Sequence, residues 1–311
     1  MHAMADSRVP ANERPVRPLS AGATYAALVL CLGWGFNQVA VKLALPGVPP
    51  LTQAAIRALG AACIVALWAR VCGVPLTIRD GTLRPGLATG VLVAVQLLLL
   101  YRALAWTTAS RAVLFLYTAP LFVALATRCT RPGDRFDLIQ WAGLALSFAG
   151  IVIAWLPAPT ADPLEAVGDA MVLGAAVTWA ATTLVINASL LHRAPFEKVL
   201  LYQLAVAGPL LALGAFVLGE RIVPAPSALA LGALLYQTVV VSGVSYLAWF
   251  ALTRRYPAGL LSWFIFLVPF FGVAAGHLVL GERLTQAFMA GMAMVTGGLA
   301  LLNRRPVDRG R

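Results

Sequence analysis

The feature that most constrains this chain is a series of long, almost uncharged apolar stretches that follow one another with short connections. A helix crosses the ~30 Å hydrocarbon core of a bilayer with about 20 apolar residues. Clusters of proline, glycine and charge divide the sequence into ten such stretches. They are residues 21–44, 52–72, 86–106, 109–129, 137–156, 168–190, 198–219, 229–252, 259–280 and 285–303. Lipid offers no hydrogen-bond partners to the backbone, so a spanning segment must satisfy its own N–H and C=O groups, as a helix does. We therefore expect an all-α integral membrane protein with ten transmembrane helices.

The composition excludes the soluble alternatives. Hydrophobic residues make up 60% of the 311 positions and charged residues 11%, whereas soluble proteins have about 45–50% and about 25%. The net charge of +11 does not indicate a nucleic-acid partner, because the basic residues are not gathered on one solvated face. The four cysteines have no paired spacing, so neither a disulfide framework nor a metal site is expected. The bilayer is the expected partner, with no cofactor.

The basic residues predict the orientation of the chain. If the N-terminus is cytoplasmic, seventeen of the 23 basic residues lie in cytoplasmic segments and four lie in external ones. The positive-inside rule favours this arrangement, with both termini in the cytoplasm. Residues 1–20 and 304–311 are then cytoplasmic tails, and residues 157–167 form an external linker.

The two halves of the chain repeat one pattern. Trp34 stands 16 residues before Pro50, and Trp179 stands 16 before Pro195. Further on, Gly133-Asp134-Arg135 returns as Gly281-Glu282-Arg283 at an offset of 148. Each copy holds five spans, in residues 21–156 and 168–303, and an odd number makes the second copy enter the membrane from the opposite side. Two inverted five-helix repeats supply two related conformations around a site near the midplane.

Polar and aromatic side chains recur on helical faces inside the spans, which predicts a path through the protein interior. Trp179, Thr183 and Asn187 are spaced four residues apart, so they share one helix face. Polar groups that face lipid are unfavourable. Hydroxyls that bridge neighbouring helices are the simpler explanation for any single serine or threonine. The candidate cavity residues are Trp34, Asn37, Gln38, Gln96, Tyr117, Trp179, Thr183, Asn187, Ser242, Ser245, Trp249 and Trp263.

Two prolines and two cations complete the candidate site. Pro120 and Pro269 interrupt helix hydrogen bonding and predict a kink or a hinge in their spans. Lys42 and Arg57 lie on neighbouring helices near the outer mouth. They would either offer a positive field to a carboxylate or extend to the outer headgroups, and the sequence leaves both alternatives open. Aromatic walls with a few hydroxyls and amides suit a small amphipathic or aromatic solute.

Absent features narrow the function. No Asp or Glu stands in the middle of a span, and Asp169, Glu220 and Glu282 stand at boundaries. Proton-coupled carriers usually carry a buried carboxylate or histidine relay, so we expect facilitated movement or a coupling that the sequence hides. No nucleophile with its base, carboxylate pair or zinc motif stands at mid-membrane, so the chain is not expected to be an enzyme. Residues 143–150 and 291–298 present helix faces with small side chains, which suit either packing between helices of one chain or a homodimer.

Motifs spread over residues 20–303 resemble the EamA type of the drug/metabolite transporter superfamily. They are Gly33-Trp34-Gly35-Phe36-Asn37, Lys42, Pro50, Arg57, Tyr101-Arg102-Ala103-Leu104, Pro120, and Gly281-Glu282-Arg283-Leu284. Within that superfamily the chain is most similar to bacterial exporters of aromatic amino acids. The resemblance implies a secondary transporter that exports aromatic and other neutral amino acids across the bacterial inner membrane by alternating access. A broad-specificity drug or nucleotide-sugar carrier of the same fold is the alternative.

Overall fold

The computed structural model describes residues 19–130, 137–156, 163–256 and 258–302, and within these ranges all regular structure is helical. Most of the expected 1–20 tail and 157–167 linker lie outside the described residues. The 304–311 tail and the Gly133-Asp134-Arg135 motif lie wholly outside them.

Nine helices or interrupted helices in the described part of the chain are long and apolar enough to cross a membrane. Six run without interruption: α1 (Ala21–Ala44), α2 (Pro50–Val71), α3 (Leu83–Ala103), α6 (Leu138–Trp155), α7 (Pro163–Ala188) and α8 (Phe196–Val217). The tenth expected span is the apolar helix α13 (Gln286–Leu302), which has 17 residues. A short 3-10 turn, η1 (Leu190–Arg193), connects α7 to α8.

The other three spans are interrupted. One is divided into α4 (Ala109–Leu116) and α5 (Ala119–Thr130), and another into α11 (Ala258–Ile265) and α12 (Val268–Leu280). Pro120 and Pro269 are each the second residue of the later helix, where a missing N–H costs nothing because the first turn has no acceptor for it. The third runs as α9 (Ala228–Leu235), the π-helical η2 (Tyr236–Val244) and α10 (Ser245–Arg255).

The connections fall into two groups, which define the two ends of the bundle. The basic end contains residues 72–82, 189–195 and 256, and the capped end contains residues 45–49, 104–108, 218–227 and 281–285. At the capped end, the Glu220 carboxylate accepts from the backbone N–H groups of Leu51 and Thr52 at 3.2 and 2.8 Å. The Glu282 carboxylate accepts likewise from Ala109 and Ser110 at 2.6 and 2.9 Å. Both carboxylates therefore satisfy free N–H groups at the positive end of a helix.

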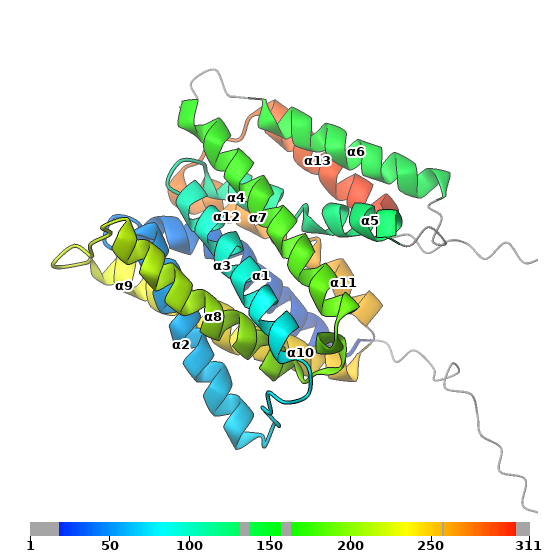
Figure 1. Cartoon of the computed structure of the whole chain (residues 1–311). Coiled ribbons are helices and arrows are strands. Elements are labelled where there is room, and N and C mark those ends of the chain that lie inside the picture. The colour runs from blue at the N-terminus through cyan, green and yellow to red at the C-terminus, as the bar shows by residue number, and fades with distance from the viewer. Residues whose placement is uncertain (1–18, 131–136, 157–162, 257, 303–311) are drawn as a thin grey trace, which may run out of the picture.

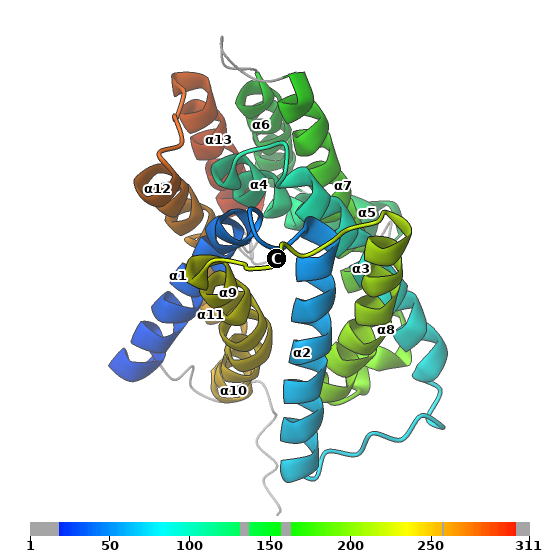
Figure 2. The same ribbon diagram turned by 90° about the vertical axis from the view of Figure 1, so that its left-hand side faces the viewer.

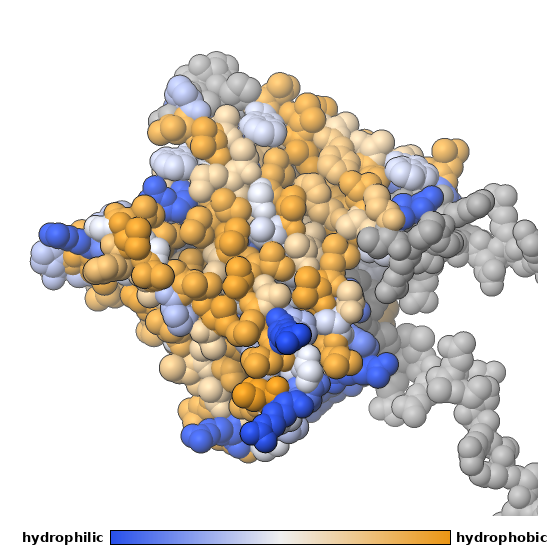
Figure 3. All heavy atoms as spheres, in the orientation of Figure 1, coloured by the Kyte–Doolittle hydropathy of each residue, from blue (hydrophilic) through white to orange (hydrophobic). Residues whose placement is uncertain are grey.

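A broad apolar surface lies between these ends, and hydrophilic residues gather towards the edges of the view (Figure 3). Large side chains such as Leu67, Val152, Leu213 and Phe216 are well exposed on it. In a soluble protein so large an apolar surface would drive aggregation. In this chain it is the face that contacts lipid.

Helices α6 and α13 pack against each other along one side of the molecule (Figures 1 and 2). Glycines allow the two backbones to approach closely. A Cβ added at Gly291 would lie 2.6 Å from the carbonyl oxygen of Gly150, and one added at Gly143 would lie 2.7 Å from that of Gly298. The remaining helices surround a central space, which contains the candidate site.

Candidate functional site

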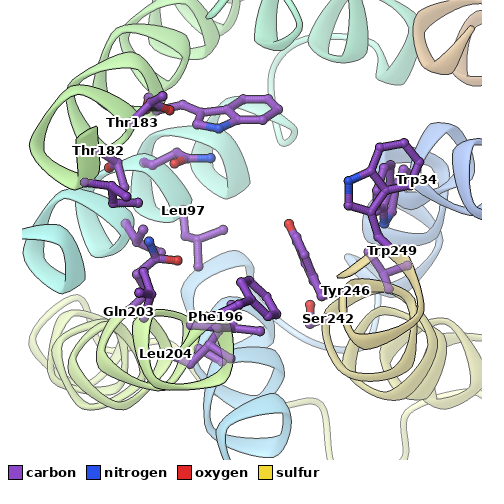
Figure 4. Close-up of a pocket in the computed structure, with 18 of the residues that line it drawn as sticks. Trp34, Leu97, Thr182, Thr183, Phe196, Gln203, Leu204, Ser242, Tyr246 and Trp249 are labelled. Carbon is purple, nitrogen blue, oxygen red and sulfur yellow. Dashed lines mark hydrogen bonds between the residues drawn. The ribbon is translucent and has the colours of Figure 1, made fainter. Parts of the chain in front are cut away.

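A cavity of about 570 Å³ lies among α1, α2, α3, α7, α8, η2 and α10 (Figure 4). Its lining includes Asn187 and His192, both exposed, near the α7–α8 connection, and no residue from the capped-end connections. The cavity therefore opens towards the basic end and is closed towards the capped end. Its volume is in the range of small-molecule sites, about 300–1,000 Å³.

Aromatic rings form two facing walls of the cavity. Trp34 donates from Nε1 to Ser245 Oγ at 2.7 Å, and its ring centroid is 5.0 Å from that of Trp249. Tyr117 and Trp179 meet edge to face at 5.5 Å on α4–α5 and α7. Figure 4 shows Trp34 and Trp249 across the open space from Thr183. Rings held in this way present rigid, mostly apolar faces to a ligand.

Arg57 is the buried cation of the cavity. Its side chain lines the space, although the residue is only 9% exposed. Its Nε donates to Ser242 Oγ and its Nη1 donates to Tyr101 Oη at 3.0 Å. Both partners are neutral hydroxyls, and the ion pairs found among the described residues do not include Arg57. Burial of a guanidinium without an opposite charge is costly.

A chain of buried hydrogen bonds connects Arg57 to the capped end. The Tyr101 hydroxyl donates to Gln237 Oε1 at 2.7 Å, and Gln237 Nε2 donates to Gln53 Oε1 at 3.1 Å. Gln53 Nε2 then donates to the Val48 carbonyl oxygen at 2.8 Å. Because these side chains come from α2, α3 and η2, the chain of bonds joins three helices and closes the cavity on this side.

Asn37 lines the same cavity from α1 and is 5% exposed. Its Nδ2 donates to Gln38 Oε1 at 3.2 Å, which fixes the orientation of the amide. The Oδ1 atom is buried and has no hydrogen-bond partner. A buried acceptor without a donor costs about 1–3 kcal/mol, so this atom is a place where a ligand could donate.

The cavity brings together most of the residues that the sequence singled out. Those that line it are Trp34, Asn37, Gln38, Gln96, Tyr117, Trp179, Thr183, Asn187, Ser242 and Trp249. Ser245 is not in the lining but holds the Trp34 ring. Trp263 is 51% exposed and packs against Phe266. Pro120 and Pro269 lie together at a separate small cavity behind Tyr117.

Lys42 and Arg57 have different surroundings. Lys42 Nζ donates to the carbonyl oxygens of Thr107 and Leu104 at 2.7 and 3.3 Å, at the end of α3. It does not line the cavity, whereas Arg57 does. The structure thus gives Lys42 a structural contact at the capped end and gives Arg57 a place in the site.

Several lining residues were not among the sequence candidates. They are chiefly Thr182, Phe196, Gln203, Tyr246 and Phe250. Gln203 has a polar amide inside an otherwise apolar span, so the sequence alone could have identified it as a candidate lining residue. Phe196 and Phe250 stack on each other near the basic end, and no periodicity distinguishes them from lipid-facing phenylalanines.

The structure buries carboxylates that the sequence placed at span boundaries. Because α7 begins at Pro163, Asp169 lies well inside the helix and is 0% exposed. It accepts from Thr107 Oγ1 at 2.5 Å and from Arg111 Nε at 2.8 Å, and Glu165 lies 3.0 Å from Arg111. These groups do not line the cavity. Among the described residues, no cluster of three His, Cys, Asp or Glu side chains could hold a metal ion.

The chain is similar to known proteins over most of its length. Residues 22–156 and 166–304 both match the model of the EamA-like transporter family. A "Probable amino-acid metabolite efflux pump" of Salmonella typhimurium is 25% identical over 286 residues, which cover 88% of this chain and 92% of that protein. A protein of the same name in Escherichia coli is 24% identical over 283 residues, with the same coverage.

A solved structure described as "Crystal structure of protein" has the same fold. Its TM-score is 0.65 and its sequence identity is 21%, over 93% of this chain and 99% of that one.

Proposed function

The chain belongs to the EamA-like transporter family, and on this premise we propose that it is a secondary transporter that exports neutral amino acids, aromatic ones included. Members of this family are transporters, which fits the expectation that the chain is not an enzyme. The observation that carries the proposal is the cavity itself, which combines aromatic walls with one buried cation and reaches only one end of the bundle.

The one-sided opening supports alternating access. A cavity that is closed at the capped end holds its ligand in contact with one side of the membrane at a time. For transport, the buried hydrogen bonds that connect Arg57 to Gln53 must break while the basic end closes. These bonds run through Tyr101 and Gln237. The breaks beside Pro120 and Pro269 are natural hinges for that change, because no continuous helix crosses them.

The two matches to one family model support the duplicated architecture. We assign residues 21–156 and 168–303 to two inverted five-helix repeats, with α13 as the tenth span. Two of the most extensively packed helix pairs, α6 with α13 and α2 with α8, each join corresponding spans of the two halves, which supports an internal two-fold relation. The positive-inside rule then places both termini in the cytoplasm and the capped end outside.

The lining favours an amino acid over a nucleotide sugar. Arg57 is the only Lys or Arg among the described lining residues, whereas a diphosphate is normally bound by several cations or donors. Neutral amides and hydroxyls supply the remaining polar contacts. The names of the Salmonella and Escherichia coli relatives point to the same substrate class.

Counterflow in proteoliposomes tests this function. Vesicles preloaded with unlabelled phenylalanine should take up labelled phenylalanine, and Thr183→Trp should lower this uptake because the larger side chain occupies part of the cavity. Val177→Trp is the matched control: it lies on the same helix, is 46% exposed and is not in the lining. It should leave uptake unchanged. Exchange of a cationic dye with no exchange of phenylalanine or threonine would overturn the substrate assignment in favour of the drug carrier.

A further inference from the structure

We infer that the cavity binds the two charged groups of a zwitterion at two separate points, the carboxylate at Arg57 and the ammonium at Asn37 Oδ1. This inference rests on the proposed function and specifies how the substrate is oriented. Two independent observations on residues that line one cavity carry it: Arg57 is a buried cation with no anion partner among the described residues, and Asn37 Oδ1 is a buried acceptor without a donor.

Among the described residues, no carboxylate forms an ion pair with Arg57. The described carboxylates are engaged elsewhere, with Lys198, Arg111, Arg254, Gln140 and the starts of α2 and α4. The Ser242 and Tyr101 hydroxyls occupy Nε and Nη1 of the guanidinium and hold its plane in place. No hydrogen bond is found for Nη2 among the described residues. A carboxylate that binds there gains charge-assisted hydrogen bonds in a site that already excludes water.

Asn37 offers the complementary group. Because its amide nitrogen is held by Gln38, the oxygen is the free atom, and an oxygen accepts from an ammonium but repels a carboxylate. Asn37 lies seven residues before the end of α1, and Arg57 lies seven residues after the start of α2. With a rise of ~1.5 Å per residue, both are ~10 Å from the capped-end termini of their helices. The two points therefore lie at one depth on consecutive helices.

The rest of the lining accounts for the side chain of such a ligand. With its charged groups near the closed end, the ligand directs its side chain towards the Trp34–Trp249 and Tyr117–Trp179 faces. Rigid aromatic faces accept rings and aliphatic chains of several sizes. Recognition is thus strict for the two charges and tolerant for the side chain.

Binding of three related probes tests the inference on the full-length protein in detergent or nanodiscs. Phenylalanine carries both charges, phenylacetate only the carboxylate, and phenethylamine only the ammonium. Quenching of the cavity tryptophans reports the Kd. We expect Arg57→Met to weaken phenylalanine and phenylacetate by about tenfold or more, ~1.4 kcal/mol, and to leave phenethylamine unchanged. Asn37→Leu should do the reverse, weakening phenylalanine and phenethylamine but not phenylacetate.

Two further variants control for folding. Arg57→Lys retains the charge without the planar fork, so it should fall between the wild type and Arg57→Met. Arg102→Met removes an arginine outside the lining and should change none of the three Kd values. Equal weakening of all three probes by Arg57→Met would show a structural role and overturn the inference.

The outcomes separate the inference from the proposed function. Phenylalanine that binds and exchanges equally in the wild type and in Arg57→Met would contradict the zwitterion site and leave the transporter standing. Arg57-dependent binding of phenylacetate together with no binding or exchange of amino acids would contradict both amino-acid export and the ammonium point.

Discussion

At the scale of single residues, three charged groups at the capped end have specific backbone partners. Lys42 caps the carbonyl oxygens at the end of α3, and the Glu220 and Glu282 carboxylates cap the starts of α2 and α4. Each satisfies backbone groups that a helix end leaves free. Arg57 differs from them, because its partners are side-chain hydroxyls and it lies beside the cavity.

Asp80 makes a comparable contact at the basic end, where it joins the α2–α3 connection to α8. The Lys198 ammonium and the Thr82 hydroxyl donate to its carboxylate. These hydrogen bonds lower the pKa of Asp80 from 3.8 to about 2. A pKa that is lower in the folded state contributes stability above the unfolded value, and this contribution is lost as the pH falls towards the folded value.

Asp80→Asn should therefore lower the melting temperature by a few degrees at pH 7, since Lys198, which is 3% exposed, loses its partner. The difference from the wild type should stay constant down to about pH 4 and shrink as the pH approaches about 2. Thermal unfolding at a series of pH values measures both. Arg79→Gln changes a charge on the same exposed connection and should have no effect. A difference that shrinks already between pH 7 and pH 5 would contradict the assigned ion pair.

At the scale of elements, the α6–α13 pair depends on the absence of side chains at four positions. Gly143 and Gly150 on α6 face Gly298 and Gly291 on α13. Between apolar helices in lipid there is no hydrophobic driving force, so close backbone packing supplies the association energy. The pair lies along one side of the molecule and away from the cavity (Figure 2), which indicates a supporting role.

Gly291→Ala should destabilise the protein by about 1–3 kcal/mol, because its Cβ would meet the Gly150 carbonyl oxygen and Ala154 at 2.6–2.7 Å. Gly297→Ala, on the same helix, has its nearest neighbour 4.0 Å away. It should be neutral or slightly stabilising, because alanine is the better helix former. Thermal unfolding of both variants in one detergent measures the contrast. An equal effect of the two substitutions would mean that the α6–α13 contact is not close.

The ends of the spans could be predicted from the sequence to within three residues, except for the start of α7, which lies five residues earlier than predicted. Length and hydropathy are set by the bilayer, so α1 occupies residues 21–44 as expected. The breaks near Pro120 and Pro269 also follow from the missing N–H of proline. The π-helical segment at Tyr236–Val244 carries no such local mark. Within this segment, Gln237 accepts a hydrogen bond from the Tyr101 hydroxyl of α3, a tertiary contact that the sequence does not reveal.

At the scale of the whole molecule, the polar stripes predicted most of the cavity because polar groups are excluded from lipid. Trp34, Trp179 and Asn37 lie in its lining, as the stripes indicated. Which way an aromatic residue points could not be predicted when its span is apolar on all sides, as for Trp263, which lies outside the lining. The hydrogen-bond partners of the two cations could not be predicted either. Lys42 and Arg57 are both basic residues within apolar spans, and only the packing of the helices decides which one contacts backbone carbonyl oxygens.

At this scale, the proposed mechanism is that one cavity serves both sides of the membrane in turn. In the structure it is open towards the basic end, and the hydrogen bonds from Arg57 to Gln53 close the other side. A static pocket with the same lining would bind the same ligands without moving them. Accessibility of the cavity from each side is therefore the property that distinguishes a transporter from a binding protein.

The most direct test is thiol labelling of a Thr183→Cys variant in which the four native cysteines are replaced. The variant must still carry out counterflow of phenylalanine. A membrane-impermeant maleimide is then applied to one side or the other of oriented vesicles. Thr183 lines the cavity. Alternating access predicts labelling from both sides, with phenylalanine slowing each rate, and no labelling of a lipid-facing Val177→Cys control. Labelling of Thr183→Cys from the basic end alone, in protein that still exchanges phenylalanine, would contradict alternating access through this cavity.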